Sequence, residues 1–174
     1  MSVVGVDVGD EQAYTAWAAG CQQRLLRSAL LLTGDLARAE DLVQEALVKV
    51  AVRWTRLRDG NPTAYARTVI HHDHVSWWRR HRRESPAPTR DRHDERPAHD
   101  TETERRMVVL TALARLTRAQ RAVLVLRHFD DLSERETAEI LGVSVGTVKS
   151  QNAAALARLR TGAPELLDLI GRIS

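Results

Sequence analysis

The sequence predicts an all-α fold, with two small helical domains joined by a flexible linker. Of the 174 residues, 43% are apolar but only 4% are aromatic, a mixture that favours helices packed through aliphatic side chains. Apolar residues recur at three- and four-residue steps, and no alternating strand pattern competes with them. A polar segment with three prolines, residues 85–104, divides the chain into two parts.

The N-terminal domain is expected over residues 11–84 and begins with a helix over about residues 11–32. The only cysteine of the chain, Cys21, lies on the apolar stripe of this helix. A single cysteine can form neither an intramolecular disulfide nor a Cys-x-x-Cys metal site. We therefore expect Cys21 to be a small buried side chain. Gly34 ends the helix.

Two further helices complete this domain. Asp35 can cap the second by accepting backbone N–H bonds, and the apolar residues of 36–54 again follow the helical period. Asn61 followed by Pro62 is typical of a helix start. The Asn side chain caps the first turn, and Pro at the first helical position lacks only an N–H that would be unpaired. The third helix is expected over residues 62–83.

The middle segment, residues 85–104, has no large aliphatic or aromatic residue. It contains three arginines and six acidic residues. Such a segment cannot bury enough apolar surface to offset the entropy lost when it is ordered. A flexible acidic linker is therefore expected here. A short tail is expected over residues 162–174.

The C-terminal domain, residues 105–161, is expected to contain four helices, the first over about residues 104–116. Capping boxes mark the next two starts, since a Ser or Thr side chain accepts a bond from the backbone three residues later while Gln or Glu reaches back. The two pairs are Thr117 with Gln120 and Ser133 with Glu136, and Ser144 caps the last helix.

The last two helices carry the pattern of a helix-turn-helix. Small Ala138 lets two short helices cross closely, and Gly142 tolerates the positive φ that the turn needs. Leu141, Val143 and Val148 are expected to close the core between the helices. The second helix would then expose short, polar or cationic side chains, as a helix in a major groove requires. These are Val145, Gly146, Thr147, Lys149, Ser150 and Asn152.

The charge pattern is compatible with a nucleic-acid partner. Of the 26 cationic residues 24 are Arg, and the formal net charge is +3. Arg suits phosphates and base edges, although a GC-rich genome would produce the same enrichment. No stretch approaches 18 uninterrupted apolar residues, and the N-terminus lacks a basic region followed by an apolar core. We therefore expect a soluble, cytoplasmic protein without membrane insertion.

No catalytic site, metal site or cofactor is expected. The sequence has no Gly-rich phosphate loop, no nucleophile triad and no paired-carboxylate signature. His71 and His74 lie three residues apart on a helix and could bind a metal together, as a metal-dependent nuclease would require. Only Asp73 lies near enough in sequence to add a carboxylate ligand. A nuclease is therefore disfavoured.

Two segments resemble a known family. The stretch LTRAQRAVLVLRHFDDLSERETAEILGVSVGTVKSQNAAALARLR resembles the C-terminal, −35-reading domain of extracytoplasmic-function (ECF) sigma factors. The stretches AEDLVQEALVKVAVRW and NPTAYARTVIHHDHVSWWRRHRRE resemble the N-terminal domain of that family. The similarity covers about residues 12–160, and the SWWRR run and short tail are typical of the compact branch common in high-GC bacteria. It implies a factor that gives promoter specificity to RNA polymerase.

The resemblance implies a docking helix for core RNA polymerase. In the family, the DLVQE helix docks on the clamp helices of the β′ subunit, which here points to Asp41, Leu42, Gln44 and Glu45. The carboxylates of Asp41 and Glu45 are one helical turn apart and repel slightly, so a basic partner surface would relieve a penalty. Without the resemblance, a solvated acidic face is the default interpretation. The β flap, promoter DNA and an anti-sigma factor are the further partners implied.

The resemblance assigns reading and melting of the −10 element to the third helix and the loop before it. Arginines can hold phosphates while aromatic rings stack on unpaired bases, and capture of an extruded base offsets the cost of unstacking it. Spacing does not decide which of Trp77 and Trp78 belongs to the core. The candidates are Arg56, Arg58, Asn61, His71, His72, Trp77, Trp78, Arg79, Arg80, Arg82 and Arg83.

The helix-turn-helix is assigned to the −35 element. Its candidate residues are Arg135, Ser144, Val145, Gly146, Thr147, Lys149, Ser150 and Asn152. The sequence departs from the family in two places. His72 stands where Asn is usual, which leaves the −10 preference open and could add mild pH sensitivity. Ala153 and Ala154 stand where Ser and Arg are frequent, so one phosphate contact is lost and the DNA affinity of the isolated domain should be weak.

Two other classes of function are open at this point. A helix-turn-helix transcriptional regulator that is not a sigma factor would join the same C-terminal motif to an unrelated sensor domain. The DLVQE and SWWRR segments argue against it. Such a regulator would need another sigma factor to start transcripts, and an adaptor that binds only protein would ignore DNA even with polymerase present.

Overall fold

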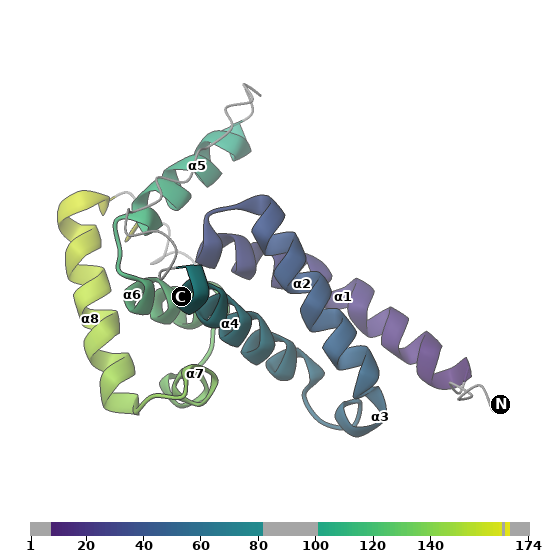
Figure 1. Ribbon diagram of the computed structural model, residues 1–174. Helices are drawn as coiled ribbons and strands as arrows, with labels where there is room; N and C mark the ends of the chain where they lie inside the picture. The colour runs from purple at the N-terminus through teal and green to yellow at the C-terminus, as the bar shows by residue number, and fades with distance from the viewer. Residues whose placement is uncertain (1–7, 82–100, 165, 168–174) are drawn as a thin grey trace.

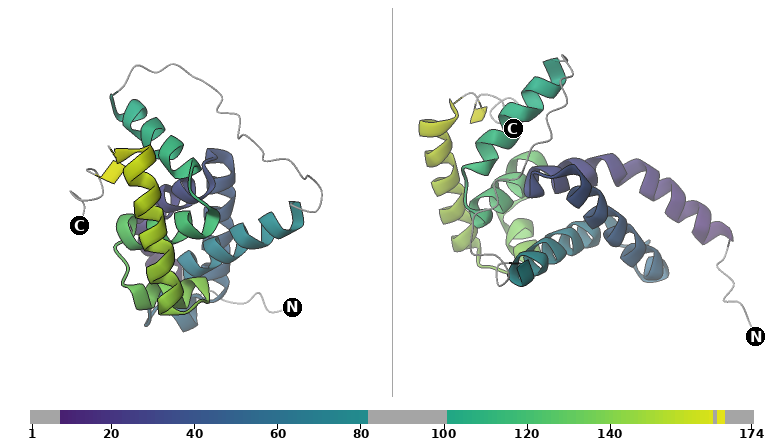
Figure 2. Two further views of the ribbon diagram at one scale, coloured as in Figure 1. Left: turned by 90° about the vertical axis from the view of Figure 1, so that its left-hand side faces the viewer. Right: turned by 45° about the horizontal axis from the view of Figure 1, so that its top comes forward.

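The computed structural model describes residues 8–81, 101–164 and 166–167, and every regular element in these ranges is a helix (Figure 1). The expected all-α class is confirmed. The helices form two bundles, and Figure 2 shows them from two further sides, with α8 on the edge farthest from the start of α1.

Some of the expectations fall outside the described residues. The expected linker, residues 85–104, is described only from residue 101 onward, where a helix begins. Most of the expected tail, residues 162–174, lies outside as well. Arg82 and Arg83, both assigned to the −10 element, also lie outside the described ranges.

The N-terminal bundle contains α1 (Val8–Thr33), α2 (Leu36–Val52), α3 (Trp54–Leu57) and α4 (Pro62–His81). Three of these four match the expected helices to within about one turn. The short α3 was not expected, because four residues are too few to reveal a helical period. It lies in the segment that the sequence indicated to be a loop.

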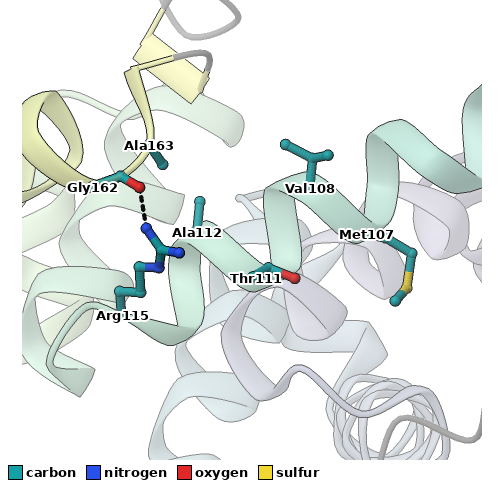
Figure 3. A pocket seen from close by; sticks show the side chains of 7 residues that line it. All are labelled: Met107, Val108, Thr111, Ala112, Arg115, Gly162 and Ala163. Carbon is teal, nitrogen blue, oxygen red and sulfur yellow. Dashed lines mark hydrogen bonds between the residues drawn. The ribbon is translucent and has the colours of Figure 1, made fainter.

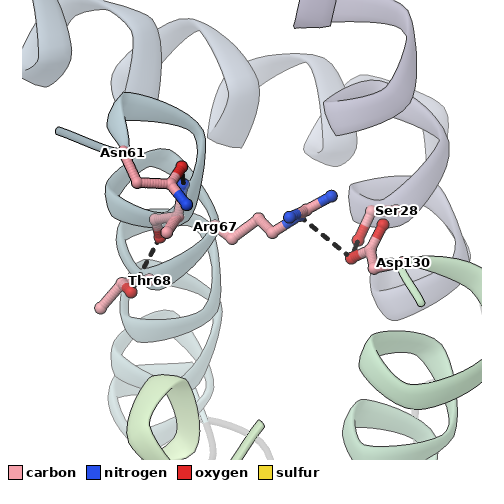
Figure 4. A network of polar contacts seen from close by, with 6 residues as sticks. Ser28, Asn61, Arg67, Thr68 and Asp130 are labelled. Atoms are coloured by element: carbon pink, nitrogen blue, oxygen red, sulfur yellow. Dashed lines mark hydrogen bonds and ion pairs between the residues drawn. The ribbon is translucent and has the colours of Figure 1, made fainter. Parts of the chain in front are cut away.

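The helix boundaries of this bundle follow the signals in the sequence. Gly34 has a φ of 77° and ends α1 in the left-handed region that favours glycine. Asp35 Oδ1 accepts the backbone N–H of Arg38 at 2.9 Å, which caps α2. Asn61 Oδ1 accepts the N–H of Ala64 at 2.9 Å, which caps α4 (Figure 4). All three expected signals are confirmed.

An aromatic cluster joins the start of α1 to α3. The rings of Tyr14, Trp17 and Trp54 lie within 5.5–5.8 Å of one another, centroid to centroid. The Trp17 indole donates a hydrogen bond to Thr63 Oγ1 at 3.1 Å, and the Tyr14 hydroxyl donates to the Leu47 carbonyl at 3.1 Å. The polar ends of these two half-buried rings are therefore paired.

The aliphatic core of the bundle lies between α1, α2 and α4. Leu42 and Ile70 are almost fully buried there, and Cys21 is buried as expected. A 2.7 Å ion pair between Lys49 Nζ and Asp73 Oδ2 connects α2 to α4 at the edge of this core.

The C-terminal bundle contains α5 (Thr101–Ala114), α6 (Arg118–Leu124), the π-helical turn η1 (Val125–Phe129), α7 (Glu134–Leu141) and α8 (Val145–Gly162). Both expected capping boxes are present, one at Thr117 and one at Ser133. The expected end near Phe129 is correct, but the last five residues form a π-helix rather than a continuation of α6.

The helix-turn-helix consists of α7 and α8 and has the expected turn. Gly142 has a φ of 64°, and Ala138 and Val148 are buried between the helices with Leu141 packed against them. Val143 was expected in this core, but its side chain is 40% exposed. The expectation was wrong because Val143 lies in the turn between the helices, directly after the left-handed residue.

The two bundles also pack directly against each other. The end of α1 contacts α6 and η1, and α4 contacts α7. Buried side chains of both bundles belong to one continuous hydrophobic cluster. The sequence predicts each bundle but not this contact, since an apolar face shows that a helix is buried and not which helix covers it.

Candidate DNA and polymerase interfaces

The exposed face of α2 carries the acidic residues that were assigned to polymerase docking. Asp41, Gln44 and Glu45 are all exposed, and Asp41 and Glu45 lie one turn apart. Leu42, assigned to the same contact, has no exposed surface. That assignment needs correction, because Leu42 points into the core shared by α1, α2 and α4 and cannot touch a partner.

Two exposed valines extend this face toward the end of α2. Val48 is 62% exposed and Val52 is 78% exposed. They follow Glu45 at intervals of three and four residues, so they lie on the same side of the helix. Sequence reasoning missed them, because an apolar residue in an amphipathic helix is normally read as core. The candidate docking surface is therefore acidic at one end and apolar at the other.

The loop residues assigned to the −10 element are exposed but partly engaged. Arg56 is exposed, whereas the Arg58 guanidinium forms an ion pair with Asp10 at the start of α1. Asn61 is exposed, and its side-chain oxygen caps α4. Of these three, Arg56 has the side chain most available to a phosphate.

The histidines of α4 differ in burial. His72 is exposed, but His71 and His74 are 9% and 7% exposed. Burial lowers the pKa of each to about 4; His72 adds to the effect at His71, and His71 with nearby arginines adds to it at His74. The assignment of His71 to DNA therefore needs correction, because its ring is buried and uncharged near neutral pH.

The far end of α4 is described only in part. Trp77 is half-buried, and the Arg38 guanidinium of α2 lies 5.1 Å from the centroid of its ring. This contact orients Trp77 by a cation–π interaction. The backbone of Trp78, Arg79 and Arg80 continues the helix, and their side chains lie outside the described residues.

The start of α8 forms the exposed side of the helix-turn-helix. Ser144 caps the helix by accepting the N–H of Thr147 at 3.1 Å. Lys149 is exposed, with Nζ 3.6 Å from Glu134 Oε2. The remaining expected residues at this surface are also exposed, namely Val145, Gly146, Thr147 and Ser150.

Two assigned −35 residues have partners within the chain. Arg135 is exposed and forms a 3.2 Å pair with Glu139 one turn later on α7. Asn152 is half-buried, and its Oδ1 lies 3.0 Å from Nε2 of His128 in η1. A surface pair of the first kind is weak and readily exchanged for a phosphate. The second contact fixes the orientation of the Asn152 amide.

A pocket of about 230 Å³ lies between α5 and the end of α8 (Figure 3). Met107 and Val108 line it and are partly exposed, and the Arg115 guanidinium donates to the Gly162 carbonyl across one end. The sequence did not indicate this pocket, because its walls come from helices that lie far apart in the chain.

Other kinds of site have no counterpart in the described ranges. No group of three or more His, Cys, Asp or Glu side chains is arranged to hold a metal ion among the residues that the structure describes. Within the same ranges, no helix is long and apolar enough to cross a membrane.

Comparison with known proteins gives consistent matches for both bundles. The sequence model of the family sigma-70 region 2 matches residues 18–84, and that of the family sigma-70 region 4 matches residues 106–159. The RNA polymerase sigma-E factor of Streptomyces avermitilis is 42% identical over 141 residues, which cover 80% of this chain and 78% of that protein. The ECF RNA polymerase sigma factor SigL of Mycobacterium tuberculosis is 32% identical over 164 residues, covering 90% and 87%.

Solved structures agree with these matches. The sigma factor RpoE in complex with the anti-sigma factor NepR from Bartonella quintana superposes with a TM-score of 0.73 at 25% identity, over 85% of this chain and 94% of that chain. CnrH in complex with the cytosolic domain of CnrY has the same fold, with a TM-score of 0.63 at 22% identity, covering 91% and 90%.

The fold and its exposed surfaces define a helical, two-bundle DNA-binding protein with a helix-turn-helix in its second bundle. The chain belongs to the sigma-70 family of RNA polymerase sigma factors, in its extracytoplasmic-function group.

Proposed function

We propose that this chain binds core RNA polymerase and directs it to promoters by reading −35 and −10 elements, with the residues assigned below. The observation that carries the assignment is the exposed first turn of α8, which presents a short polar surface on a helix-turn-helix with both capping boxes formed. The proposed place of action is the cytoplasm, where the polymerase is.

The −35 element is read by the first turns of α8. Gly146 and Thr147 allow the helix to approach the major groove, and Lys149 can reach guanine acceptors or a phosphate. We assign Arg135 and Ser144, which are both exposed, to phosphate contacts. Asn152 contributes through its amide, whose orientation is fixed by the hydrogen bond with His128.

The −10 element is opened by α3, the following loop and α4. Arg56 and His72 are exposed side chains of these elements, and we assign both to DNA. Trp77 stands at its edge, where a ring can stack on an unpaired base. The sequence assigns the basic end of the helix to phosphates through Arg79, Arg80, Arg82 and Arg83.

Core polymerase docks on the exposed face of α2. The carboxylates of Asp41 and Glu45 repel each other on the free helix, and a basic surface of the β′ clamp helices would relieve that repulsion. Val48 and Val52 supply apolar area beside them. Exposed apolar side chains next to a charged rim are the usual composition of a protein interface.

A second polymerase contact, with the β flap, is assigned to the pocket between α5 and α8. Met107 and Val108 offer apolar surface there. Because α8 has 18 residues, its DNA-reading start and its end at the pocket lie about 27 Å apart. An occupant of the pocket would therefore leave the −35 surface free.

An anti-sigma factor is a further proposed partner. The two similar solved structures are complexes, RpoE with the anti-sigma factor NepR and CnrH with the cytosolic domain of CnrY. RpoE superposes over most of both chains, which extends the similarity to both bundles. A partner of this kind would hold the bundles in one arrangement and keep them from the promoter.

Run-off transcription with purified core polymerase tests the function. We expect new RNA 5′ ends at defined promoters when this chain is the only sigma factor present. A helix-turn-helix regulator that is not a sigma factor would yield them only after another sigma factor is added. If the chain forms no complex with core polymerase and yields no new 5′ ends, the proposal is wrong.

Charge reversal on α2 tests the docking surface separately. Glu45→Lys should weaken binding to core polymerase at least about tenfold, since it opposes a basic partner surface. Glu11→Lys is the matched control, because Glu11 is an exposed acidic residue near the start of α1, outside the proposed surface. Equal affinity of both variants would contradict the assignment.

A further inference from the structure

One acidic residue of the C-terminal bundle is held by two residues of the N-terminal bundle (Figure 4). The Ser28 hydroxyl of α1 donates to Asp130 Oδ2 at 2.8 Å, and Arg67 Nε of α4 lies 3.6 Å from the same oxygen. The side chain of Asp130 is 6% exposed and that of Arg67 is 15% exposed. This is a nearly dry ion pair across the boundary between the bundles.

A second polar contact crosses the same boundary. The Arg121 guanidinium of α6 donates through Nη1 to the Leu32 carbonyl at 3.2 Å and through Nε to the Leu113 carbonyl at 2.9 Å. Leu32 belongs to the last turn of α1, where carbonyl groups have no partner within the helix. A cation at this position also interacts favourably with the helix dipole.

The packed arrangement cannot read both promoter elements at once. As their names imply, the −35 and −10 elements lie about 25 base pairs apart, or about 85 Å along B-form DNA. In the structure α4 packs against α7 of the helix-turn-helix. With 20 residues in α4 and 18 in α8, the two helices have lengths of only about 30 and 27 Å. The bundles must therefore separate before both elements are bound.

We propose that the free chain closes on itself and that Asp130, held by Ser28 and Arg67, is the latch of this autoinhibited arrangement. Burial raises the pKa of the Asp130 carboxyl, while Arg67 and the Ser28 hydrogen bond act to lower it. Each charge is therefore tolerated in the boundary only because the other is present. If one is removed, the other is left buried without a counter-charge, and opening the bundles is the direct way to hydrate it.

The latch is tested on the full-length chain alone, by single-molecule FRET between the bundles. Dyes are attached in a Cys21→Ala background at Val52→Cys in α2 and Ala153→Cys in α8, both exposed positions. We expect one short-distance population for the parent chain. Asp130→Asn and Arg67→Gln should each lower the ratio of closed to open molecules at least about tenfold.

Two further variants separate a latch from a general loss of structure. Asp131→Asn removes the same charge one position later, at an exposed residue, and should leave the distance unchanged. The exchange Arg67→Asp with Asp130→Arg restores opposite charges and should recover the closed population. Far-ultraviolet circular dichroism should report the same helicity for all variants.

Two results would overturn the proposal. One is an unchanged short distance in both Asp130→Asn and Arg67→Gln, and the other is a parent chain that is already open. The closure itself does not depend on the proposed function. Only the statement that the closed form prevents promoter binding rests on it. Because the FRET measurement contains no polymerase or DNA, a failure of transcription would overturn the function and leave the closure intact.

Discussion

Asn152 in the recognition helix α8 and His128 in the π-helical turn η1 are joined by a 3.0 Å hydrogen bond from Nε2 to Oδ1. Recognition of adenine by Asn uses the side-chain oxygen and nitrogen together. The bond from His128 occupies one of the two acceptor positions of the Asn152 oxygen and fixes the orientation of the amide. The pairing thus influences which base edges the helix can read, although His128 itself is not on the DNA-reading surface.

Replacing His128 should change base preference more than overall affinity. We expect His128→Phe to free Asn152 and shift discrimination at one base pair by about 1–3 kcal/mol toward adenine. Binding selections with randomised −35 sequences, carried out on the holoenzyme, would measure it. Asn152→Ala is the matched control, since it should abolish discrimination at that base pair. A loss spread evenly over all sequences would indicate that Asn152 contacts only phosphate.

Two neighbouring faces of α2 should respond differently to truncation. Leu42→Ala should lower the free energy of unfolding by about 2–5 kcal/mol, because Leu42 is fully buried. Val48→Ser removes an exposed side chain and should leave the stability within about 0.5 kcal/mol, while weakening the complex with core polymerase. Chemical denaturation and polymerase titration measure the two effects. Equal polymerase affinity of Val48→Ser and the parent would remove Val48 from the docking surface.

The same substitution at two glycines should have opposite effects. Neither Gly20 nor Gly142 has a neighbouring atom within 4 Å of an added Cβ, so crowding plays no part. Gly142 has a φ of 64°, where a Cβ costs about 1–2 kcal/mol. Gly20 lies within α1, where alanine is favoured over glycine by about 0.5–1 kcal/mol. In thermal unfolding, the Tm of Gly142→Ala should be lower than that of the parent, and the Tm of Gly20→Ala should be higher.

Mild acid should destabilise the protein through His71 and His74. Their pKa is lowered from 6.5 to about 4 in the folded chain, so between these values the unfolded chain binds more protons. Their contribution is present above pH 6.5 and is lost as the pH falls toward 4. At pH 5.5 the loss is on the order of 1 kcal/mol per histidine.

The charged groups around these histidines also favour their neutral form. His72 faces His71, and Arg121, Arg38 and Arg118 face His74, so protonation adds positive charge to a positive surrounding. Unfolding from pH 7.5 to 5 should show less pH dependence in His74→Gln, and the exposed control His72→Gln should behave like the parent. Identical slopes would contradict the prediction.

Local signals in the sequence predicted the helices and their starts. The capping boxes at Thr117 and Ser133 and the left-handed Gly142 depend on residues a few positions apart, which a sequence displays directly. The burial of His71 and the exposure of Val48 were not predictable in this way. Both depend on which helix covers a given face, and helical periodicity does not contain that information.

In the candidate site, too, the local features were predictable from the sequence and the contacts between distant residues were not. The exposed first turn of α8 was predicted, because the helix-turn-helix pattern fixes which side of that helix is solvent-facing. The hydrogen bond between Asp130 and Ser28 joins residues 102 positions apart, and no pattern along the chain connects them. Contacts between the bundles are therefore the part of this protein that required a structure.

The aromatic cluster of Tyr14, Trp17 and Trp54 has a practical consequence for spectroscopy. All four tryptophans and both tyrosines of the chain precede residue 79, and Phe129 is its only other ring of this type. Intrinsic fluorescence therefore reports on the first bundle and is nearly blind to the helix-turn-helix. A tryptophan-detected melt describes half of the molecule, and an optical probe of the second half has to be introduced.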